Sequence, residues 1–122
     1  MALAPKTSKD RKVLASIDIG SQAVQMLVAS FSPDGKMEPI NEYVAATHLG
    51  QGLPQTGELA QENMERTVAA AKEMQDIALK EGVSSIFVTT CSAIRDARNR
   101  SSFLLLCNQQ LNIYPQLLSG KD

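Results

Sequence analysis

Residues 13–31 read VLASIDIGSQAVQMLVASF, two apolar runs on either side of a Gly-Ser turn. Apolar runs bounded by turn residues predict strands, so the two runs are expected to pair as a β-hairpin. Asp18 stands just before the turn. Because Gly20 has no Cβ, the chain can turn sharply there and bring backbone N–H groups and the Ser21 hydroxyl close to an anion. The stretch predicts a phosphate-binding turn, and the alternative is a plain hairpin turn in which Asp18 only shapes the backbone.

The rest of the chain continues with further strands and helices. The expected strands are Val13 to Ile19, Ala23 to Phe31, Met37 to Thr47, Ser85 to Thr90 and Ile113 to Leu118. Apolar residues that recur every three or four positions predict helices, which are Gln61 to Glu81 and Arg100 to Gln110, with a short helical turn from Ser92 to Ala97. The fourth strand is apolar without alternation, which is typical of a strand buried on both faces.

Several residues mark the expected ends of these elements. Ala60 is a poor N-cap for the long helix, and Gly82 is a typical residue just beyond a helix C-terminus. Asn99 is a good N-cap for the last helix. Residues 49–54, with two Gly and a Pro, predict a flexible, exposed loop.

The order of elements predicts the fold. Three antiparallel strands followed by helix, strand, helix and strand form a mixed α/β sheet of about five strands, the β-β-β-α-β-α-β order of a ribonuclease H-like or actin-like ATPase half-domain. We expect residues 1–12 to be a flexible tail and residues 13–122 to form this one domain. Ligands of such sheets bind beyond the carboxyl ends of the strands. Three loops are expected to meet there, Asp18 to Gln22, Thr89 to Arg95 and Ser119-Gly120.

Composition excludes several kinds of partner. Twelve basic and 13 acidic side chains give a net charge of −1, so no basic surface for nucleic acid is expected. Cys91 and Cys107 are too far apart for a Cys-x-x-Cys motif, and with one His they cannot assemble a zinc site. No run reaches membrane-spanning length, and no membrane partner is expected. The chain is predicted to be cytoplasmic.

Four motifs in this order resemble those of the exopolyphosphatase and guanosine pentaphosphate phosphohydrolase family, also called Ppx/GppA phosphatases, within the actin-like ATPase superfamily. The motifs are Ile17-Asp18-Ile19-Gly20-Ser21, Leu49-Gly50-Gln51-Gly52-Leu53 with Thr56-Gly57-Glu58-Leu59, Thr90-Cys91-Ser92-Ala93-Ile94-Arg95-Asp96-Ala97-Arg98-Asn99-Arg100 with Phe103, and Leu118-Ser119-Gly120. The third motif is the most specific, and the four together cover nearly the whole chain.

The resemblance implies an enzyme that uses Mg²⁺ and an activated water to remove the terminal phosphate from polyphosphate or guanosine pentaphosphate. The substrate is bound between two half-domains, and the intact protein is a candidate homodimer. The first half-domain supplies a phosphate turn and a phosphate-gripping guanidinium. The phosphate-binding residues so implied are Asp18, Gly20, Ser21, Gln22, Ser92 and Arg95, with Asp18 also holding Mg²⁺ through water.

The chain departs from the family pattern at two places. The family turn continues Ser-Asn-Ser and then places an Arg, whereas this chain has Gln22, Ala23 and Gln25, and so lacks a short amide, a hydroxyl and a cation. In the family, the final Ser-Gly turn runs into two acidic residues, the second of which is the catalytic Glu. Asp122 matches the first of them only, so the sequence predicts a truncated member with no catalytic residue inside the chain and no activity alone.

Other interpretations of single residues remain open. Arg95 could be a surface residue paired with Asp96 or Glu73, and Arg98 and Arg100 are interpreted as solvated charges. His48 is interpreted as a structural residue without a catalytic partner. Cys91 is either a thiol with a lowered pKa or a small buried residue.

Two other functions are weighed. A ribonuclease H-like nuclease requires several carboxylates at the sheet edge, and the fourth strand offers none there. The second is a non-catalytic regulator of the same fold that senses a phosphorylated nucleotide or binds a partner protein, which the Gln22 and Gln25 replacements fit.

Overall fold

The computed structural model describes residues 11–113 and 115–117, in which five strands form one sheet in the order β3-β2-β1-β4-β5. The strands are β1 Lys12–Ile19, β2 Ala23–Phe31, β3 Met37–Ala46, β4 Ser85–Thr90 and β5 Gln116–Leu117. The helices are α2 Leu53–Thr56, α3 Gln61–Lys80, α4 Ser92–Arg95 and α5 Arg100–Leu111. The predicted β-β-β-α-β-α-β order is confirmed, with the short helix α2 added before α3.

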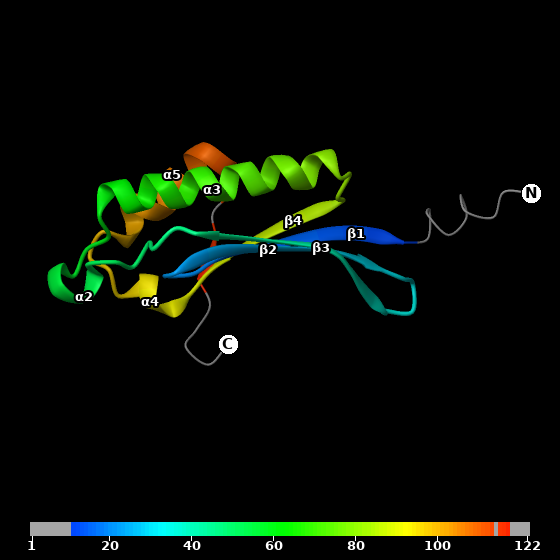
Figure 1. Cartoon of the computed structure of the whole chain (residues 1–122), viewed down its shortest axis with the longest axis horizontal. Helices are drawn as coiled ribbons and strands as arrows, with labels where there is room; N and C mark the ends of the chain where they lie inside the picture. The colour runs from blue at the N-terminus through cyan, green and yellow to red at the C-terminus, as the bar shows by residue number, and fades with distance from the viewer. Residues whose placement is uncertain (1–10, 114, 118–122) are drawn as a thin grey trace, which may run out of the picture.

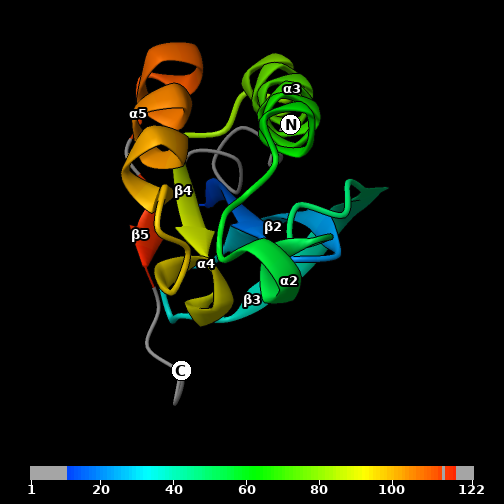
Figure 2. The same cartoon turned by 90° about the vertical axis from the view of Figure 1, so that its left-hand side faces the viewer.

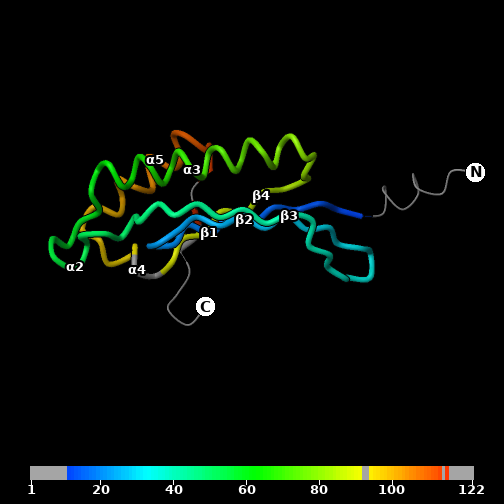
Figure 3. Tube along the Cα trace, in the orientation of Figure 1, coloured from blue at the N-terminus to red at the C-terminus, as the bar shows by residue number. Residues whose placement is uncertain are grey.

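The first strand, β1, is central to the sheet. It pairs antiparallel with β2, where Ile19 lies opposite Val24, and parallel with β4, where Ile19 lies opposite Thr90. The chain trace shows how β1 to β4 run side by side (Figure 3). Because β1 and β4 are parallel, the segments that follow them begin at the same edge of the sheet.

Within residues 11–113 and 115–117, helices cover one face of the sheet and leave the other open (Figure 1). Figures 1 and 2 show α3 and α5 on one side of the strands, with α4 at the end of the sheet on the other side. Along β1, Ile17 and Ile19 are fully buried towards the helices, whereas Ser16 and Asp18 are exposed on the opposite, open face. This alternation is what a strand with one covered face requires.

The core lies between the helices and the covered face of the sheet, and three of its residues are at its margin. Ile17, Val28, Val88, Met64, Val68 and Phe103 are all at most 3% exposed, and the partly buried Ile86, Leu106 and Ile113 pack against them. Burying such a side chain contributes roughly 1.5–3 kcal/mol, so this helix–sheet layer is the main source of stability.

Two predictions about burial were wrong. The side chain of Phe87, in the middle of β4, is 55% exposed, because no helix of the described residues covers the open face. Residues 49–54 are not simply an exposed loop, since Leu49 is fully buried and Leu53 starts α2. The expected last strand is shorter, and Leu118 lies outside the described residues, as do Ser119, Gly120 and Asp122.

The helix ends agree with the prediction in one helix and not in the other. Ala60 precedes α3 without a side-chain cap, and Gly82 follows it with a φ of 79°. Asn99 precedes α5, but its side chain makes no capping hydrogen bond. Its amide instead bonds both backbone groups of Leu59, at 2.8 Å and 2.9 Å. A long-range partner has displaced the local one.

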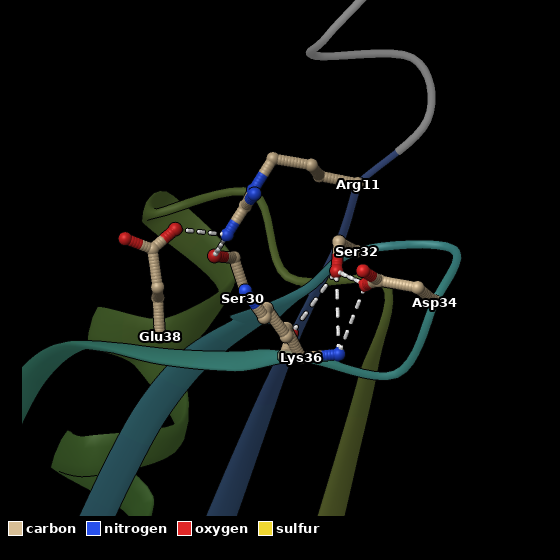
Figure 4. A network of polar contacts seen from close by, with 6 residues as sticks. All are labelled: Arg11, Ser30, Ser32, Asp34, Lys36 and Glu38. Atoms are coloured by element: carbon tan, nitrogen blue, oxygen red, sulfur yellow. Dashed lines mark hydrogen bonds and ion pairs between the residues drawn. The ribbon is translucent and has the colours of Figure 1, made fainter.

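The turn between β2 and β3 lies at the end of the sheet where β1 and β4 begin, which we call the far end. A polar network surrounds this turn (Figure 4). Arg11 donates to the Ser30 hydroxyl at 2.6 Å and to Glu38. Ser32 donates to Asp34, whose carboxylate also accepts the Lys36 N–H at 3.2 Å. The Ser32 hydroxyl, and then the Lys36 N–H, hold the pKa of Asp34 below its ordinary value.

Candidate phosphate site

The segments that carry the predicted phosphate-binding residues meet at one edge of the sheet. The turn Gly20–Gln22 follows β1, and Cys91 with α4 follows β4. The Cys91 N–H donates to the Ile19 carbonyl at 3.2 Å, which joins the two segments directly. The edge therefore gathers Asp18, Gly20, Ser21, Gln22, Ser92 and Arg95. Their roles as ligands of phosphate stay a prediction.

Asp18 lies within β1 and not in the turn. Its side chain is exposed on the open face, and the Thr89 hydroxyl of the neighbouring strand donates to its carboxylate at 3.2 Å. It shares a hollow of about 110 Å³ with Gln25 and Glu42. The carboxylate is thus held across the β1–β4 pair. The plain-turn alternative requires Asp18 to shape the backbone of the turn, and the Asp18 side chain does not do so.

Gly20 serves the turn by its small size. Its N–H donates to the Ala23 carbonyl at 2.9 Å, and a Cβ at this position would lie 3.2 Å from that oxygen. The Gly20 N–H is therefore engaged within the hairpin. The half-buried Ser21 and the exposed Gln22 present the side chains of the turn.

A second loop, residues 47–53, packs directly on the turn. The Gly50 N–H donates to the Ser21 carbonyl at 2.9 Å, and a Cβ on Gly50 would come within 2.8 Å of the Ser21 Cβ. The Gln22 carbonyl accepts the N–H groups of Thr47 and His48 at 3.1 Å and 3.0 Å. This loop was not predicted to belong to the site, although its two glycines were the signal that could have shown it.

The turn and the second loop enclose a depression of about 550 Å³. It is lined by Ser21, Gln22, His48, Gly50, Gln51, Leu53 and Pro54. The first turns of α3 support the wall of this depression, because Arg66 donates to the Thr47 carbonyl at 2.9 Å and to the Asn63 side chain at 2.7 Å. Asn63 in turn donates to the Gln51 carbonyl at 3.1 Å.

Hydrogen bonds from Arg98 join the segment after α4 to the segment at the end of α2. Arg98 donates from its backbone to the Gly57 carbonyl at 2.9 Å and from its guanidinium to the Thr56 carbonyl at 2.8 Å. A Cβ on Gly57 would come within 2.3 Å of that guanidinium. Arg100 donates to the Arg95 carbonyl at 2.5 Å. Arg98 and Arg100 are both exposed, as expected for solvated charges, but each guanidinium also donates to a backbone carbonyl around the site.

Arg95 is the last residue of α4 and is half-buried. Within the described part of the chain its guanidinium forms no ion pair, so the alternative pairing with Asp96 or Glu73 is not found. Its positive charge is therefore not neutralised by either carboxylate, and a planar guanidinium suits the oxygens of a phosphate.

The two cysteines differ in their surroundings. Cys107 is fully buried on α5, and this burial raises the pKa of its thiol to about 12, so it stays protonated at neutral pH. Cys91 is half-buried directly after β4. Cys107 thus acts as a small core residue.

Asp18 is the residue that the sequence assigns to a metal ion at this edge. Across residues 11–113 and 115–117, no three His, Cys, Asp or Glu side chains form a cluster that could hold a metal. Mg²⁺ often keeps several waters and binds through one or two carboxylates together with substrate phosphates. The exposed Asp18 fits that kind of shared, hydrated site.

No helix in the same residues is long and apolar enough to cross a membrane.

Comparisons with known proteins extend over most of the chain. The model of the Ppx/GppA phosphatase family matches residues 27–122. Exopolyphosphatase 1 of Mycobacterium tuberculosis is 25% identical over 109 residues, which are 89% of this chain and 32% of the relative. The crystal structure of the Aquifex aeolicus member of the Ppx/GppA family matches with a TM-score of 0.84 and 30% identity, covering 88% of this chain and 35% of that one.

An exopolyphosphatase structure from Cytophaga hutchinsonii matches with a TM-score of 0.83 at 22% identity, which supports the fold alone. The chain spans about a third of the length of these relatives. The predicted actin-like ATPase half-domain fold is confirmed by the likeness to the Aquifex structure.

Proposed function

The chain belongs to the Ppx/GppA phosphatase family, and we propose that it forms one phosphate-binding half of a hydrolase that releases the terminal phosphate of inorganic polyphosphate. Guanosine pentaphosphate is the second substrate that we propose. The proposed setting is a cytoplasmic protein that acts as a homodimer.

One observation carries this proposal. The strand pairing of β1 with β4 brings the Gly20–Gln22 turn and α4 to the same edge, and the Arg95 guanidinium there has no ion-pair partner among the described residues. A net charge of −1 gives the chain no overall attraction for a polyanion. Phosphate recognition would then depend on a few placed groups, which this edge provides.

The proposed roles follow from where each residue lies. Ser21 and Gln22 donate hydrogen bonds from the turn, Arg95 binds phosphate oxygens as a forked cation, and Ser92 contributes a backbone N–H at the start of α4. Asp18 orients a water-coordinated Mg²⁺, which when bound would neutralise phosphate charge. Gly20 and Gly50 allow the close approach that positions Ser21.

These residues bind and orient the substrate but include no group that we assign as the base. In the family that the chain resembles, the water-activating base is a Glu, and none of these residues matches it. General-base catalysis contributes roughly a hundred- to ten-thousand-fold in rate, and positioning by the facing half-domain contributes further. We therefore propose that the 122-residue chain binds polyphosphate without turning it over.

Binding and turnover should be measured on the purified chain. Calorimetry with polyphosphate and with guanosine pentaphosphate, at millimolar Mg²⁺, should show binding that Arg95→Ala weakens at least roughly tenfold, because a charged donor is lost. Lys72→Ala on the outer surface of α3 is the matched control and should leave affinity unchanged. Equal affinity of wild type and Arg95→Ala would contradict the site, and phosphate release that requires Arg95 would contradict the assignment of the base.

A further inference from the structure

His48 belongs to the same depression as the proposed phosphate turn. His48 lines that depression of about 550 Å³ together with Ser21 and Gln22. Its side chain is exposed, so it is not a buried core histidine. The interpretation of His48 as a purely structural residue leaves its place beside the turn without an explanation.

The backbone holds His48 firmly against the turn. Its N–H donates to the Gln22 carbonyl at 3.0 Å, and its carbonyl accepts the Gln51 N–H at 3.1 Å. The preceding Thr47 is held from the other side, because its carbonyl accepts from Arg66 at 2.9 Å. The imidazole therefore starts from a fixed point next to Ser21 and Gln22.

The conformation of His48 is unusual for a residue with a side chain. Its φ is +53°, one of two positive values among the non-glycine residues described. Left-handed backbone is disfavoured for L-residues and is often retained where a side chain has a function. Glycine stands in the left-handed conformation only four positions later, at Gly52, yet position 48 carries an ionisable side chain.

His48 is also the one ionisable side chain that lines the depression, as far as residues 11–113 and 115–117 show. The elements packed around it add little opposing charge. The turn Gly20–Gln22 and α2 contain no charged residue, and the Arg66 guanidinium of α3 is engaged with Thr47 and Asn63. A protonated imidazole would thus face an anion without a neighbouring carboxylate to neutralise it.

We propose that protonated His48 contacts the phosphate chain beside Ser21 and Gln22, and that it makes polyphosphate binding tighten as the pH falls. This inference rests on the proposed phosphate-binding function of the same edge. The imidazolium adds a positive charge and favours the anion, whereas the neutral ring contributes only a hydrogen bond.

The test is a titration of the full 122-residue chain with long-chain polyphosphate at low salt between pH 5.5 and 8, in which NMR shifts report binding. The internal phosphates of a long chain stay ionised over this range, so its charge changes little. Wild type should bind roughly two- to fivefold more tightly at pH 5.5 than at pH 7.5, because an ionic contact at an exposed site contributes less than about 1 kcal/mol.

Two variants of His48 separate charge from conformation. Asn tolerates left-handed backbone, so His48→Asn should fold, bind with the affinity that wild type has at high pH, and lose the pH dependence. His48→Arg should bind tightly at every pH. Melting curves of each variant confirm folding. Any titration of the ligand itself acts equally on all three proteins and cancels in the comparison.

The outcomes distinguish this inference from the function on which it rests. If Arg95→Ala weakens binding but wild type and His48→Asn share one pH profile, the phosphate site stands and the role of His48 is wrong. If polyphosphate shifts no resonance of the Ser21 turn or of His48 at any pH, both proposals fail. A pH dependence that disappears in His48→Asn and is replaced by uniformly tight binding in His48→Arg establishes the role.

Discussion

The two ends of the sheet are stabilised in different ways. At the far end, the β2–β3 turn itself is held by bonds between residues at most four positions apart, as among Ser32, Asp34 and Lys36, and the longer-range contacts beside it come from one residue, Arg11. At the carboxyl end, several side-chain bonds from different residues join positions that are 12 to 42 apart, from Asn63–Gln51 to Arg98–Thr56, beside short-range bonds such as Arg66–Asn63. A local turn is formed by its own sequence, whereas the candidate site forms only when the whole domain is folded. Substitutions at the two ends should therefore have unequal effects.

The largest effect is expected for Asn99→Ala. This change leaves the backbone N–H and C=O of the buried Leu59 without partners, and each such group costs roughly 1–3 kcal/mol, so the free energy of unfolding should fall by about 2–4 kcal/mol. Urea denaturation measures the loss. Asn99→Asp keeps the acceptor and should lose less. If Asn99→Ala lowers the free energy of unfolding by no more than the loss of an N-cap does, about 1 kcal/mol, the Asn99–Leu59 hydrogen bonds are not what stabilises this end.

Gly50→Ala should be next. Its Cβ would lie 2.8 Å from the Ser21 Cβ, so the loop or the turn must move, and overpacking of this kind costs about 1–3 kcal/mol. The matched control is Gly52→Ala, which meets open space but has a φ of 88°, so it is strained without touching Ser21. Amide NMR shifts of Ser21 should change in the first variant only. Equal shifts in both would mean that Gly50 does not position the turn.

Ser32→Ala at the far end should have a smaller effect. The exposed Ser32–Asp34 bond is local, and its loss should lower stability by less than about 1 kcal/mol. The pKa of Asp34 should rise towards its ordinary value of 3.8, because the Ser32 hydroxyl is the main cause of its lowering. An NMR titration of the carboxyl carbon reports this. A change in polyphosphate binding would show that the two ends are coupled after all.

Tyr43→Phe should have the smallest effect on stability. It tests whether a long-range contact that is exposed contributes as little as a local one. Tyr43 and Asn41 donate to Glu81 at 2.6 Å and 2.9 Å and lower the pKa of its carboxyl, but this long-range contact is exposed. A lowered folded-state pKa stabilises the protein above the ordinary value of 4.5, and the contribution is lost as the pH falls through the folded value. Melting temperatures of both proteins at pH 3 to 7 should differ slightly above pH 4.5 and converge in acid. A large difference would mean that distance in sequence matters more than burial.

The sequence alone determined the elements and their order. Apolar runs predicted β1, β2 and β4, and the spacing of Met64, Val68 and Met74 predicted α3, because strands and helices bury side chains at fixed intervals. Four motifs in a fixed order indicated the family. These signals are local, so they can be recognised without knowing what packs against them.

Only the tertiary structure decided which partners the polar residues have. Asn99 bonds Leu59 and not its own helix, Arg98 holds a distant loop, and Phe87 is exposed because just one face of the sheet is covered. The same holds for His48, which reaches the depression through a left-handed backbone. Hydrogen bonds and exposure depend on residues that are far away in the sequence, so no local pattern could reveal them.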